Sequence, residues 1–504
     1  MSDTYLKRIL DARIYDLAVE TPLDEIPLIS ERLGNSVFLK REDLQPVFSF
    51  KIRGAYNKLL NLSDEDRAAG VVAASAGNHA QGLALAAKHL GIKAIIVMPR
   101  TTPMIKVEAV RRRGAKVVLH GDAYDEASVY AKNLVEEKGM KYIPPFDDPD
   151  VIAGQGTVAM EILRQHPQHI DAVFVPVGGG GLCAGVAAYI KAVRPNTKVF
   201  AVEAEDSACL KAAMEKKRRV VLPTVGIFAE GVAVAQIGKE TYNVIKSTID
   251  GVITANSDEM CAAIKDIFED TRSIAEPAGA LSLAGLKKYV AQNGVKGKTL
   301  IAIDSGANTN FDRLRYISER TEIGEKREAI FAVTIPEKPG SYKKFCQIIG
   351  RRQITEFNYR YAHGKDAHIF VGLQISSEGN DRQDIIDVLQ KAGYGVVDMT
   401  DNEMAKLHIR HMVGGHAPMV DNEIVYRFEF PERPGALLDF LTRLAGRWNI
   451  SMFHYRNHGA AFGRVLAGLQ VPVDERKQLE LLLKELNYSY WDETSNPAYT
   501  FFLG

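Results

Sequence analysis

The sequence has 504 residues, 46% of them hydrophobic, and its 63 basic and 63 acidic side chains give a formal net charge of zero. A chain of this length exceeds what one hydrophobic core usually supports, so we expect at least two compact units. The charge balance gives no electrostatic basis for binding nucleic acid or an anionic membrane, and no apolar run approaches the length of a transmembrane helix.

The N-terminal segment, residues 1–20, mixes acidic, basic and apolar residues at helical spacing. It lacks the apolar core of a signal peptide. The four cysteines lie far apart, without the paired spacing of a zinc site or a redox motif, so we expect reduced, buried thiols. These features predict a cytoplasmic protein.

From about residue 37 to residue 310, short apolar runs alternate with longer helical patterns. The predicted strands are SVFLK at 36–40, GVVAAS at 70–75, KAIIVMP at 93–99, AKVVLHG at 115–121, DAVFVPV at 171–177, KVFAVEA at 198–204, DGVITA at 250–255 and KTLIAID at 298–304. Strands of this kind, alternating with helices, predict parallel sheets that are buried on both faces. Ligands in such folds bind at the carboxyl ends of the strands, where this chain has its glycine-rich turns.

Lys51 lies in the stretch SFKIRGA, residues 49–55, among apolar and glycine neighbours. A lone lysine in this setting usually packs its stem on apolar surface and extends its amine to water. Alternatively, burial lowers the pKa of the amine enough for it to form a Schiff base. The stretch by itself does not decide between these interpretations.

Three further turns follow predicted strands. In GGGGL, residues 178–182, four glycines enter a helix, so that backbone N–H groups can converge on a phosphate; the alternative is a tight turn for close helix packing. In SAGNHAQG, residues 75–82, Ser75 and Asn78 suit helix capping, and the same groups suit a substrate carboxylate. DSGAN, residues 304–308, is by itself an ordinary polar turn.

The C-terminal part contains one module twice. The stretch AIFAVTIPEKPGSYKKFCQII from Ala329 aligns with IVYRFEFPERPGALLDFLTRL from Ile424. Three further pairs of stretches also match, and in all four pairs the two members lie 94 to 96 residues apart. Each copy predicts the order strand, Pro-Gly turn, helix, strand, strand, helix, strand. Residues 410–423 are the predicted linker between the copies.

The four motifs SFKIRGA, SAGNHAQG, GGGGL and DSGAN, in this order, resemble the signature set of fold type II pyridoxal phosphate enzymes. The longer strings KREDLQPVFSFKIRGAY, PPFDDPDVIAGQGT, FAEGVAV and AEPAGAL narrow the resemblance to biosynthetic threonine ammonia-lyases, also called threonine dehydratases, over essentially the whole chain. The resemblance implies an α/β catalytic domain at residues 1–320, with parallel sheets flanked by helices. Two ACT-like α+β regulatory modules would follow at 329–401 and 424–504. Modules of this type bind amino acids and pair sheet to sheet.

The resemblance also implies a role for individual residues. Lys51 would be the Schiff-base lysine and the base that removes the α-proton of the substrate. The other implied cofactor contacts are Phe50 near the ring, Asn78 at the ring hydroxyl, Ser305 at the pyridine nitrogen, and Gly178, Gly179, Gly180, Gly181 and Leu182 at the phosphate of pyridoxal 5'-phosphate. Ser75, Ala76 and Gly77 would receive the substrate carboxylate. Strand alternation sends Asp304 and Ser305 to opposite faces, and the resemblance selects Ser305 as the inward residue.

The implied reaction is deamination of L-threonine to 2-oxobutanoate and ammonia, the first step of isoleucine biosynthesis, with L-serine as a side substrate. The resemblance further implies a homotetramer that isoleucine inhibits, with valine as the effector that opposes this inhibition. Tyr359 and Tyr455 occupy equivalent positions in the two copies and are either sheet aromatics or effector-site residues. The turns at 336–340 and 431–435 are likewise either structural or part of an effector site.

Other interpretations stay open. Another fold type II enzyme, such as a serine dehydratase, a racemase or a β-replacement enzyme, fits the motifs, but these usually lack the doubled module. A non-catalytic sensor built on an inactive enzyme would not be expected to keep Lys51, Asn78, the polyglycine turn and Ser305 all intact. Glu203 and Asp206 mark a cation site in some relatives, but we interpret them as solvated loop acids and expect no metal. Leu44, Phe48 and Ala278 depart from the usual family residues and are expected near, not at, the inferred contacts.

Overall fold

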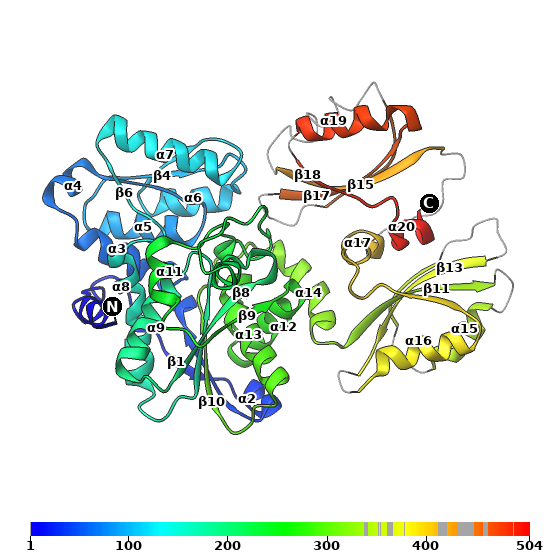
Figure 1. The fold of residues 1–504 in the computed structure, drawn as a ribbon, viewed down its shortest axis with the longest axis horizontal. Coiled ribbons are helices and arrows are strands. Elements are labelled where there is room, and N and C mark those ends of the chain that lie inside the picture. The colour runs from blue at the N-terminus through cyan, green and yellow to red at the C-terminus, as the bar shows by residue number, and fades with distance from the viewer. Residues whose placement is uncertain are drawn as a thin grey trace. The chain divides into compact units, whose positions relative to one another are not determined.

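The computed structural model describes residues 2–336, 341–350, 352, 354–359, 366–376, 379–411, 421–431, 448–456, 462–486 and 488–503. The chain divides into two compact units, Met1–Ser318 and Glu319–Gly504, coloured blue to green and light green to red in Figure 1. No helix in these ranges is long and apolar enough to cross a membrane.

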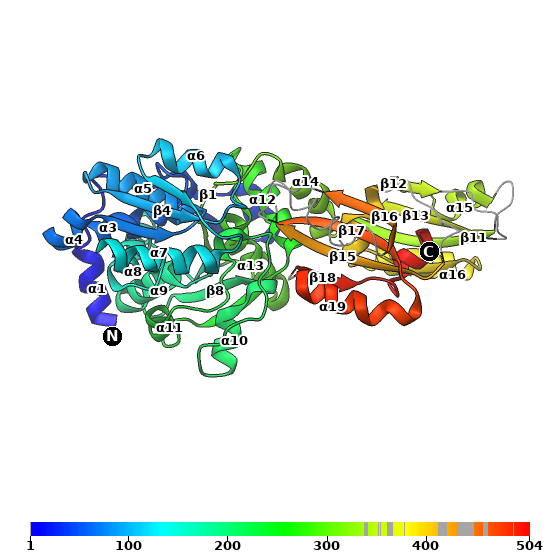
Figure 2. The same cartoon turned by 90° about the horizontal axis from the view of Figure 1, so that it is seen from above.

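The first unit contains a small parallel sheet of order β5-β4-β3-β6. Its strands are β3 (Val71–Ala74), β4 (Ala94–Met98), β5 (Lys116–Leu119) and β6 (Lys141–Tyr142), and the nearby helices are α3 (Lys51–Leu60), α4 (Asp64–Ala69), α5 (Asn78–His89), α6 (Met104–Arg112) and α7 (Tyr124–Lys138). Successive residues of β3 face opposite sides: Val72 and Ala74 pack with α7, whereas Val71 and Ala73 pack with α3 and α5. Figures 1 and 2 both show the sheet between α7 and the pair α5 and α6.

The first unit also contains a sheet of order β1-β2-β10-β7-β8-β9, in which only β1 is antiparallel to its neighbour. Its strands are β1 (Leu23–Glu25), β2 (Ser36–Arg41), β7 (Ala172–Pro176), β8 (Lys198–Ala204), β9 (Gly251–Ala255) and β10 (Thr299–Asp304). All eight predicted strands are confirmed, whereas β1 and β6 were not predicted. The fold class, a catalytic α/β unit with parallel sheets, is also confirmed.

Helices cover both faces of the larger sheet. The further helices of this unit are α1 (Ser2–Leu10), α2 (Pro27–Leu33), α8 (Pro149–Gln165), α9 (Gly181–Val193), α10 (Cys209–Glu215), α11 (Lys239–Ile245), α12 (Ser257–Thr271) and α13 (Pro277–Asn293), with 3-10 turns η1 (Glu42–Leu44), η2 (Glu205–Ser207) and η3 (Glu230–Val232). Helix α14 (Arg313–Gly324) begins in this unit and ends in the second. Val173 and Val175 of β7 pack against α8 and α9. Phe174, between them, turns to the other face, where its ring lies 5.4 Å from that of Tyr289 on α13. Buried apolar residues on both faces explain why these strands have almost no polar positions.

Local signals fix where the site-bearing helices begin. Asp148 caps α8, accepting hydrogen bonds from the amides of Asp150 and Val151, and Pro149 occupies the first helical position. Of the four cysteines, Cys183, Cys209 and Cys261 are buried, as predicted. The side chain of Cys346 lies outside the described part of the chain.

The second unit contains two antiparallel sheets, β12-β13-β11-β14 and β16-β17-β15-β18. In each sheet the strands of one copy follow the same order: second, third, first, fourth. The strands are β11 (Glu328–Pro336), β12 (Ile354–Tyr359), β13 (Asp366–Gln374), β14 (Gly395–Asp398), β15 (Glu423–Pro431), β16 (Asn449–Arg456), β17 (Phe462–Gln470) and β18 (Ser489–Asp492). The helices are α15 (Ser341–Ile349), α16 (Asp381–Lys391), α17 (Glu403–Leu407), α19 (Arg476–Leu486) and α20 (Pro497–Phe502), with turns η4 (Ile409–His411) and η5 (Val473–Glu475). The duplication read from the sequence is therefore visible as a duplicated sheet.

Each of these sheets has two apolar faces. In the first module, Phe331 and Val333 pack with α15 and α16. The intervening residues Ile330 and Ala332 face a cluster that also contains Val425 and Leu466 of the second module, α17 and the C-terminal α20. We call this group of residues from both modules the shared cluster.

Two asparagines occupy equivalent places beside the shared cluster. Asn402 caps α17 and Asn496 caps α20, each through its own side chain. The Asn402 amide also donates a hydrogen bond of 3.2 Å to the Asn496 side-chain oxygen. The two modules of the second unit therefore meet along matching elements.

Several predicted features lie outside the described residues. They are the Pro-Gly turns beyond Pro336 and Pro431, the predicted helix of the second copy, and linker residues 412–420. Tyr359 and Tyr455 belong to β12 and β16, but their side chains also fall outside the described part.

Candidate active site

Lys51 is the first residue of α3, at the end of a loop that is bonded to the DSGAN turn. The amide of Phe50 donates to the Ser305 carbonyl at 3.2 Å, and the amide of Ala307 donates to the Phe48 carbonyl at 2.9 Å. Phe48 itself has a left-handed backbone, with φ of 56°. The two motifs are therefore adjacent in space although they lie about 250 residues apart in the sequence.

The Lys51 amine is turned into the protein. Its nitrogen donates a hydrogen bond of 2.9 Å to the Pro145 carbonyl and lies 5.2 Å from the centre of the Phe50 ring. Burial lowers the pKa of this amine to about 8, against the opposing effect of Glu276. The interpretation that Lys51 extends its amine into solvent is therefore wrong.

The polyglycine turn presents amides, not carbonyls. The Gly179 carbonyl accepts from the Thr241 hydroxyl at 2.7 Å, and the Gly180 carbonyl accepts from the amide of Ala184 at 2.8 Å. The first N–H groups of α9, which begins at Gly181, have no partner within the helix. These N–H groups and the helix dipole together favour an anion at this end of α9.

A side chain on these glycines would collide with the walls of the turn. A Cβ on Gly178 would lie 2.8 Å from the Cα of Val232, and one on Gly179 would lie 2.1 Å from the Phe146 ring. Gly180 has φ of 91°, which glycine adopts without strain. The turn is thus a cradle that only glycine can form, and it fits a phosphate group.

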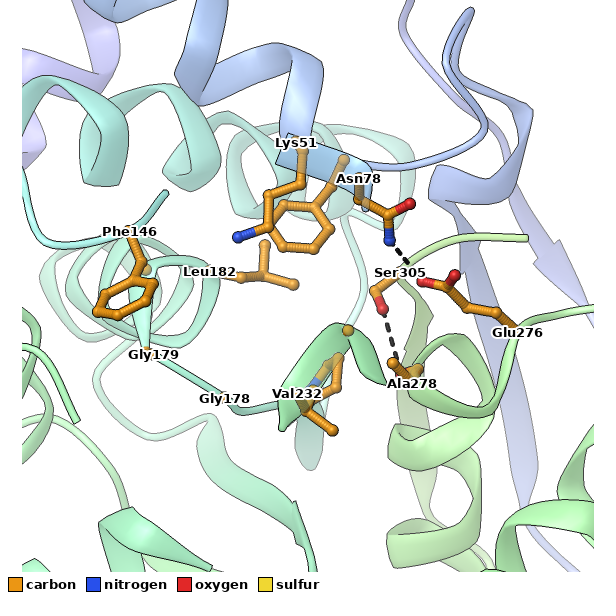
Figure 3. A pocket seen from close by; sticks show the side chains of 15 residues that line it. Lys51, Asn78, Phe146, Gly178, Gly179, Leu182, Val232, Glu276, Ala278 and Ser305 are labelled. Carbon is orange, nitrogen blue, oxygen red and sulfur yellow. Dashed lines mark hydrogen bonds between the residues drawn. The ribbon is translucent and has the colours of Figure 1, made fainter. Parts of the chain in front are cut away.

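These elements surround one pocket. It is lined by Phe50, Lys51, Asn78, Phe146, Pro176, Gly178, Gly179, Gly180, Gly181, Leu182, Gly231, Val232, Glu276, Ala278 and Ser305. All nine residues predicted to contact the cofactor are in this set. Figure 3 shows Lys51, Asn78 and Ser305 around the pocket, with the turn at Gly178 and Gly179 in its wall.

The predicted substrate loop is next to this set but not part of it. The Ser75 hydroxyl accepts from the amides of Gly77 at 3.4 Å and Ala80 at 3.3 Å, so it serves the start of α5. The N-cap of α5 is Gly77, and Asn78 is the first helical residue. A Cβ on Gly77 would meet no atom within 4 Å, so space remains open beside this loop.

Asn78 is held at both ends of its side-chain amide. Its nitrogen donates to Glu276 at 2.6 Å, and its oxygen accepts from the Asn308 amide at 2.7 Å. The Asn308 amide also donates to the Val47 carbonyl at 2.7 Å. The last residue of the DSGAN turn therefore orients Asn78 and connects it to the loop that precedes Lys51.

Ser305 lines the pocket and Asp304 does not. The Ser305 hydroxyl donates to the Ala278 carbonyl at 3.2 Å (Figure 3). Asp304 is fully buried, where burial and the neighbouring Asp43 raise its pKa well above the usual range. Ala278, one of the positions that depart from the usual family residues, also lines the pocket, next to Ser305.

A buried ion network lies beneath the helix that carries Lys51. Lys40, Glu42, Arg53 and Glu161 are all fully buried. The Arg53 guanidinium donates to Glu42 at 2.7 Å and to Glu161 at 2.5 and 2.9 Å, and the Lys40 amine donates to Glu161 at 2.6 Å. Two cations and two anions thus neutralise each other and fix α3 to β2, η1 and α8.

Several functional neighbours were missed from the sequence. Glu276, Phe146, Gly231 and Val232 line the pocket without having been predicted. Glu203 was interpreted as a solvated loop acid, and this is wrong: it is fully buried and accepts from the amides of Leu210 and Lys211 at 2.7 and 2.8 Å. It therefore caps α10. Asp206 is exposed, and no cluster suited to a metal ion occurs among the described residues.

Comparisons with known proteins agree with this geometry. Residues 14–306 match the family of pyridoxal-phosphate dependent enzymes, and residues 319–409 and 414–503 each match the C-terminal regulatory domain of threonine dehydratase. The chain is 54% identical to the biosynthetic L-threonine dehydratase of Burkholderia multivorans, covering 100% of this chain and 99% of that one. It is 55% identical to the Escherichia coli biosynthetic L-threonine dehydratase, over 99% and 97% of the two chains.

The chain belongs to the biosynthetic threonine dehydratases. A dehydratase of this family is a pyridoxal phosphate enzyme with a C-terminal regulatory domain. Among solved structures, the processed threonine deaminase isoform 2 of Solanum lycopersicum is similar at 48% identity with a TM-score of 0.63, over 64% of this chain and 88% of that one. Maize serine racemase is similar at 34% identity with a TM-score of 0.59, over 62% and 95%. The catalytic fold alone therefore does not identify the reaction.

Proposed function

We propose that this dehydratase converts L-threonine to 2-oxobutanoate and ammonia and that its C-terminal modules regulate the reaction. The observation that carries the proposal is the Lys51 amine, hydrogen-bonded to the Pro145 carbonyl, in the same pocket as the amide-lined start of α9. The curated relatives with full-length similarity are named threonine dehydratases, which supports L-threonine as the substrate.

The pocket residues fit the cofactor that the family uses. The N–H groups from Gly178 to Leu182 would hold its phosphate, Phe50 would pack near its ring, Asn78 would bond its ring hydroxyl, and Lys51 would carry it through the side-chain amine. The chemistry that pyridoxal phosphate supplies is an electron sink for negative charge on the α-carbon of an amino acid. The protein supplies position, orientation and electrostatics.

Lys51 would also act as the base that removes the α-proton. A pKa of about 8 leaves a substantial neutral fraction near neutral pH, which an ordinary lysine lacks. The loop at Ser75, Ala76 and Gly77 would receive the substrate carboxylate on its free N–H groups, and the open space beside Gly77 supports this. L-Serine would be a side substrate because it lacks only one methyl group, worth about 1 to 3 kcal/mol in a pocket.

Ser305 would face the pyridine nitrogen of the cofactor. A hydroxyl can donate a hydrogen bond to that nitrogen but cannot keep it protonated as a carboxylate would. A neutral ring is the weaker electron sink, so loss of the β-hydroxyl would be favoured over reprotonation at the α-carbon. Asp304, which could supply a carboxylate, lies outside the pocket lining.

Regulation would reside in the duplicated modules. We propose isoleucine as inhibitor, valine as the opposing effector and a homotetramer as the active assembly. The match of both modules to a threonine dehydratase regulatory domain supports a regulatory role. Tyr359 and Tyr455, at equivalent positions in β12 and β16, are the proposed effector-site residues.

The direct test locates the lysine that binds the cofactor and measures the reaction with and without isoleucine. Borohydride treatment of the cofactor-saturated protein, followed by peptide mass analysis, should place the pyridoxyl group on Lys51. Release of 2-oxo acid from L-threonine should fall when isoleucine is added. An unmodified Lys51 would remove the proposed site, racemisation of L-serine without net 2-oxo acid release would favour a racemase, and turnover indifferent to isoleucine would remove the regulatory claim.

A further inference from the structure

Glu276 is the one carboxylate among the residues that line the described pocket, and Lys51 is the one amine. Glu276 occupies the N-cap position of α13, where a short polar side chain would normally bond the helix amides. Its side chain makes no such bond. It turns into the pocket instead, where it accepts the 2.6 Å hydrogen bond from Asn78 (Figure 3).

The carboxyl group of Glu276 is closely confined by two loops. A Cβ on Gly231 would lie 3.3 Å from its bonded oxygen, and one on Gly306 would lie 3.1 Å from the same oxygen. The backbone of Glu276 is also fixed, because its amide donates to the Gly306 carbonyl at 3.0 Å. The position of the carboxyl group is therefore set by the fold rather than by side-chain freedom.

The surroundings of Glu276 favour a protonated carboxyl group. Burial raises its pKa, ahead of the opposing effects of the Asn78 hydrogen bond and of the Lys106 and Arg313 cations. Both of those cations are hydrogen-bonded to Glu230, whose own charge further raises the pKa of Glu276. The other charged groups that face it are Lys51, within the pocket, and Asp304, behind it.

Loss of water from L-threonine requires two proton transfers at different atoms. The α-proton must be removed, and the β-hydroxyl must gain a proton because hydroxide is a poor leaving group. In the proposed function Lys51 removes the α-proton. Among the described pocket residues, this leaves Glu276 as the carboxylic acid available for the second transfer.

We propose that Glu276 is a second catalytic residue, the general acid that protonates the departing β-hydroxyl group; this inference rests on the proposed threonine dehydration. The electron pair of the α-C–H bond forms the α,β double bond, and the β-C–O bond breaks with its pair on oxygen. That oxygen takes the Glu276 proton and leaves as water. Lys51 is then an ammonium and Glu276 a carboxylate in one pocket, and return of the proton from Lys51 to Glu276 restores both groups.

The test compares two leaving groups in one variant. Glu276→Gln keeps an oxygen that can accept from Asn78 but holds no transferable acid proton. With L-threonine, kcat should fall by about 100-fold or more, the usual contribution of a general acid. With β-chloro-L-alanine, whose chloride leaves without a proton, kcat should stay near the value of the unmodified enzyme. The absorption spectrum and the cofactor dissociation constant should not change.

Each other outcome is decisive. Equal losses for both substrates, or a weakened cofactor complex, would show that Glu276 only positions Asn78 and would overturn the inference; an unchanged threonine rate would overturn it as well. An unmodified enzyme that eliminates chloride but not the threonine hydroxyl would instead refute the proposed substrate. If Glu276→Gln does not fold, the pH profile of the unmodified enzyme decides: kcat for L-threonine should fall with rising pH as an acid loses its proton, and kcat for β-chloro-L-alanine should not. Matching profiles would contradict the inference.

Discussion

Replacing Arg53 by methionine should destabilise the first unit far more than the loss of a surface ion pair. Arg53 is fully buried and lies two residues after Lys51 on α3. Methionine fills much of the same volume but removes all the hydrogen bonds that the guanidinium donates to Glu42 and Glu161. Lys40 then remains as the one cation beside two buried carboxylates.

The expected loss of unfolding free energy follows from this imbalance of one cation and two anions. Breaking a buried ion pair by removing one partner costs about 3 to 5 kcal/mol, because an unpaired charge is left in a medium of low dielectric constant. The matched control is Arg8→Met, since Arg8 pairs with Asp150 at 3.1 Å but its side chain is 47% exposed. Exposed pairs of this kind contribute about 0.2 to 1 kcal/mol.

The two tryptophans make the measurement specific. Trp448 and Trp491 both lie in the second unit, so tryptophan fluorescence follows that unit, whereas far-ultraviolet circular dichroism follows both units. In a urea titration, Arg53→Met should lower the circular dichroism transition of the first unit and leave the fluorescence transition in place. A loss no larger than that of Arg8→Met would refute the reasoning.

A double variant tests whether the charges act together. Arg53→Met with Glu161→Gln again leaves one cation and one anion, so its loss of stability should be smaller than the sum of the two single losses. Strict additivity would show that the four residues do not behave as one network.

Further predictions concern the pocket and its surroundings. Gly179→Ala should weaken cofactor binding by about tenfold or more, because its Cβ would overlap the Phe146 ring, whereas Gly395→Ala, whose Cβ would meet Thr334 at 3.5 Å, should not change the dissociation constant. The rate of cofactor incorporation into apoprotein should rise with pH and level off near the Lys51 pKa of about 8, since the neutral amine is the nucleophile; a rise that continues past pH 10 would contradict a lowered pKa. Ser305→Asp should divert substrate from elimination toward racemisation or amino transfer, and an unaltered product ratio would argue against the role of Ser305. Burial raises the pKa of Glu203 from 4.5 to about 7, so the folded state binds its proton more tightly than the unfolded state does. The stability that this proton contributes is therefore lost as the pH rises from 4.5 through 7. In Glu203→Gln the midpoint of urea unfolding should depend less on pH over that interval.

The local sequence pattern is sufficient to predict an element where one short segment contains all the residues that define it. The eight predicted strands contain short apolar runs, such as AIIVM at 94–98 and VFAV at 199–202, which indicate buried parallel strands. β1 is the stretch LDE and β6 has two residues, so neither carries a pattern of its own, and each forms only because a neighbouring strand is available. The glycine turn and Lys51 stand out as local motifs, but each motif by itself leaves a structural alternative open, and the resemblance to a known family is what assigns them to a cofactor site.

The residues that sequence reasoning missed act through distant partners. Lys40 and Glu161 are 121 positions apart, and a charged residue in a strand or helix is ordinarily assigned to the surface. Glu276 was seen only within a family string, because nothing in that string shows that its side chain leaves the helix terminus to meet Asn78, 198 positions earlier. Such roles depend on which segments the fold brings together, and periodicity contains no information about that.

The shared cluster has a consequence for how the regulatory part assembles. A lone module of this kind would expose the sheet face that carries Ile330 and Ala332, and it would need a second chain to cover that face. Here the partner is tethered to the same polypeptide, so the pairing is intramolecular and its extent does not depend on protein concentration. Dilution should therefore leave the paired modules intact, even under conditions in which contacts between separate chains dissociate.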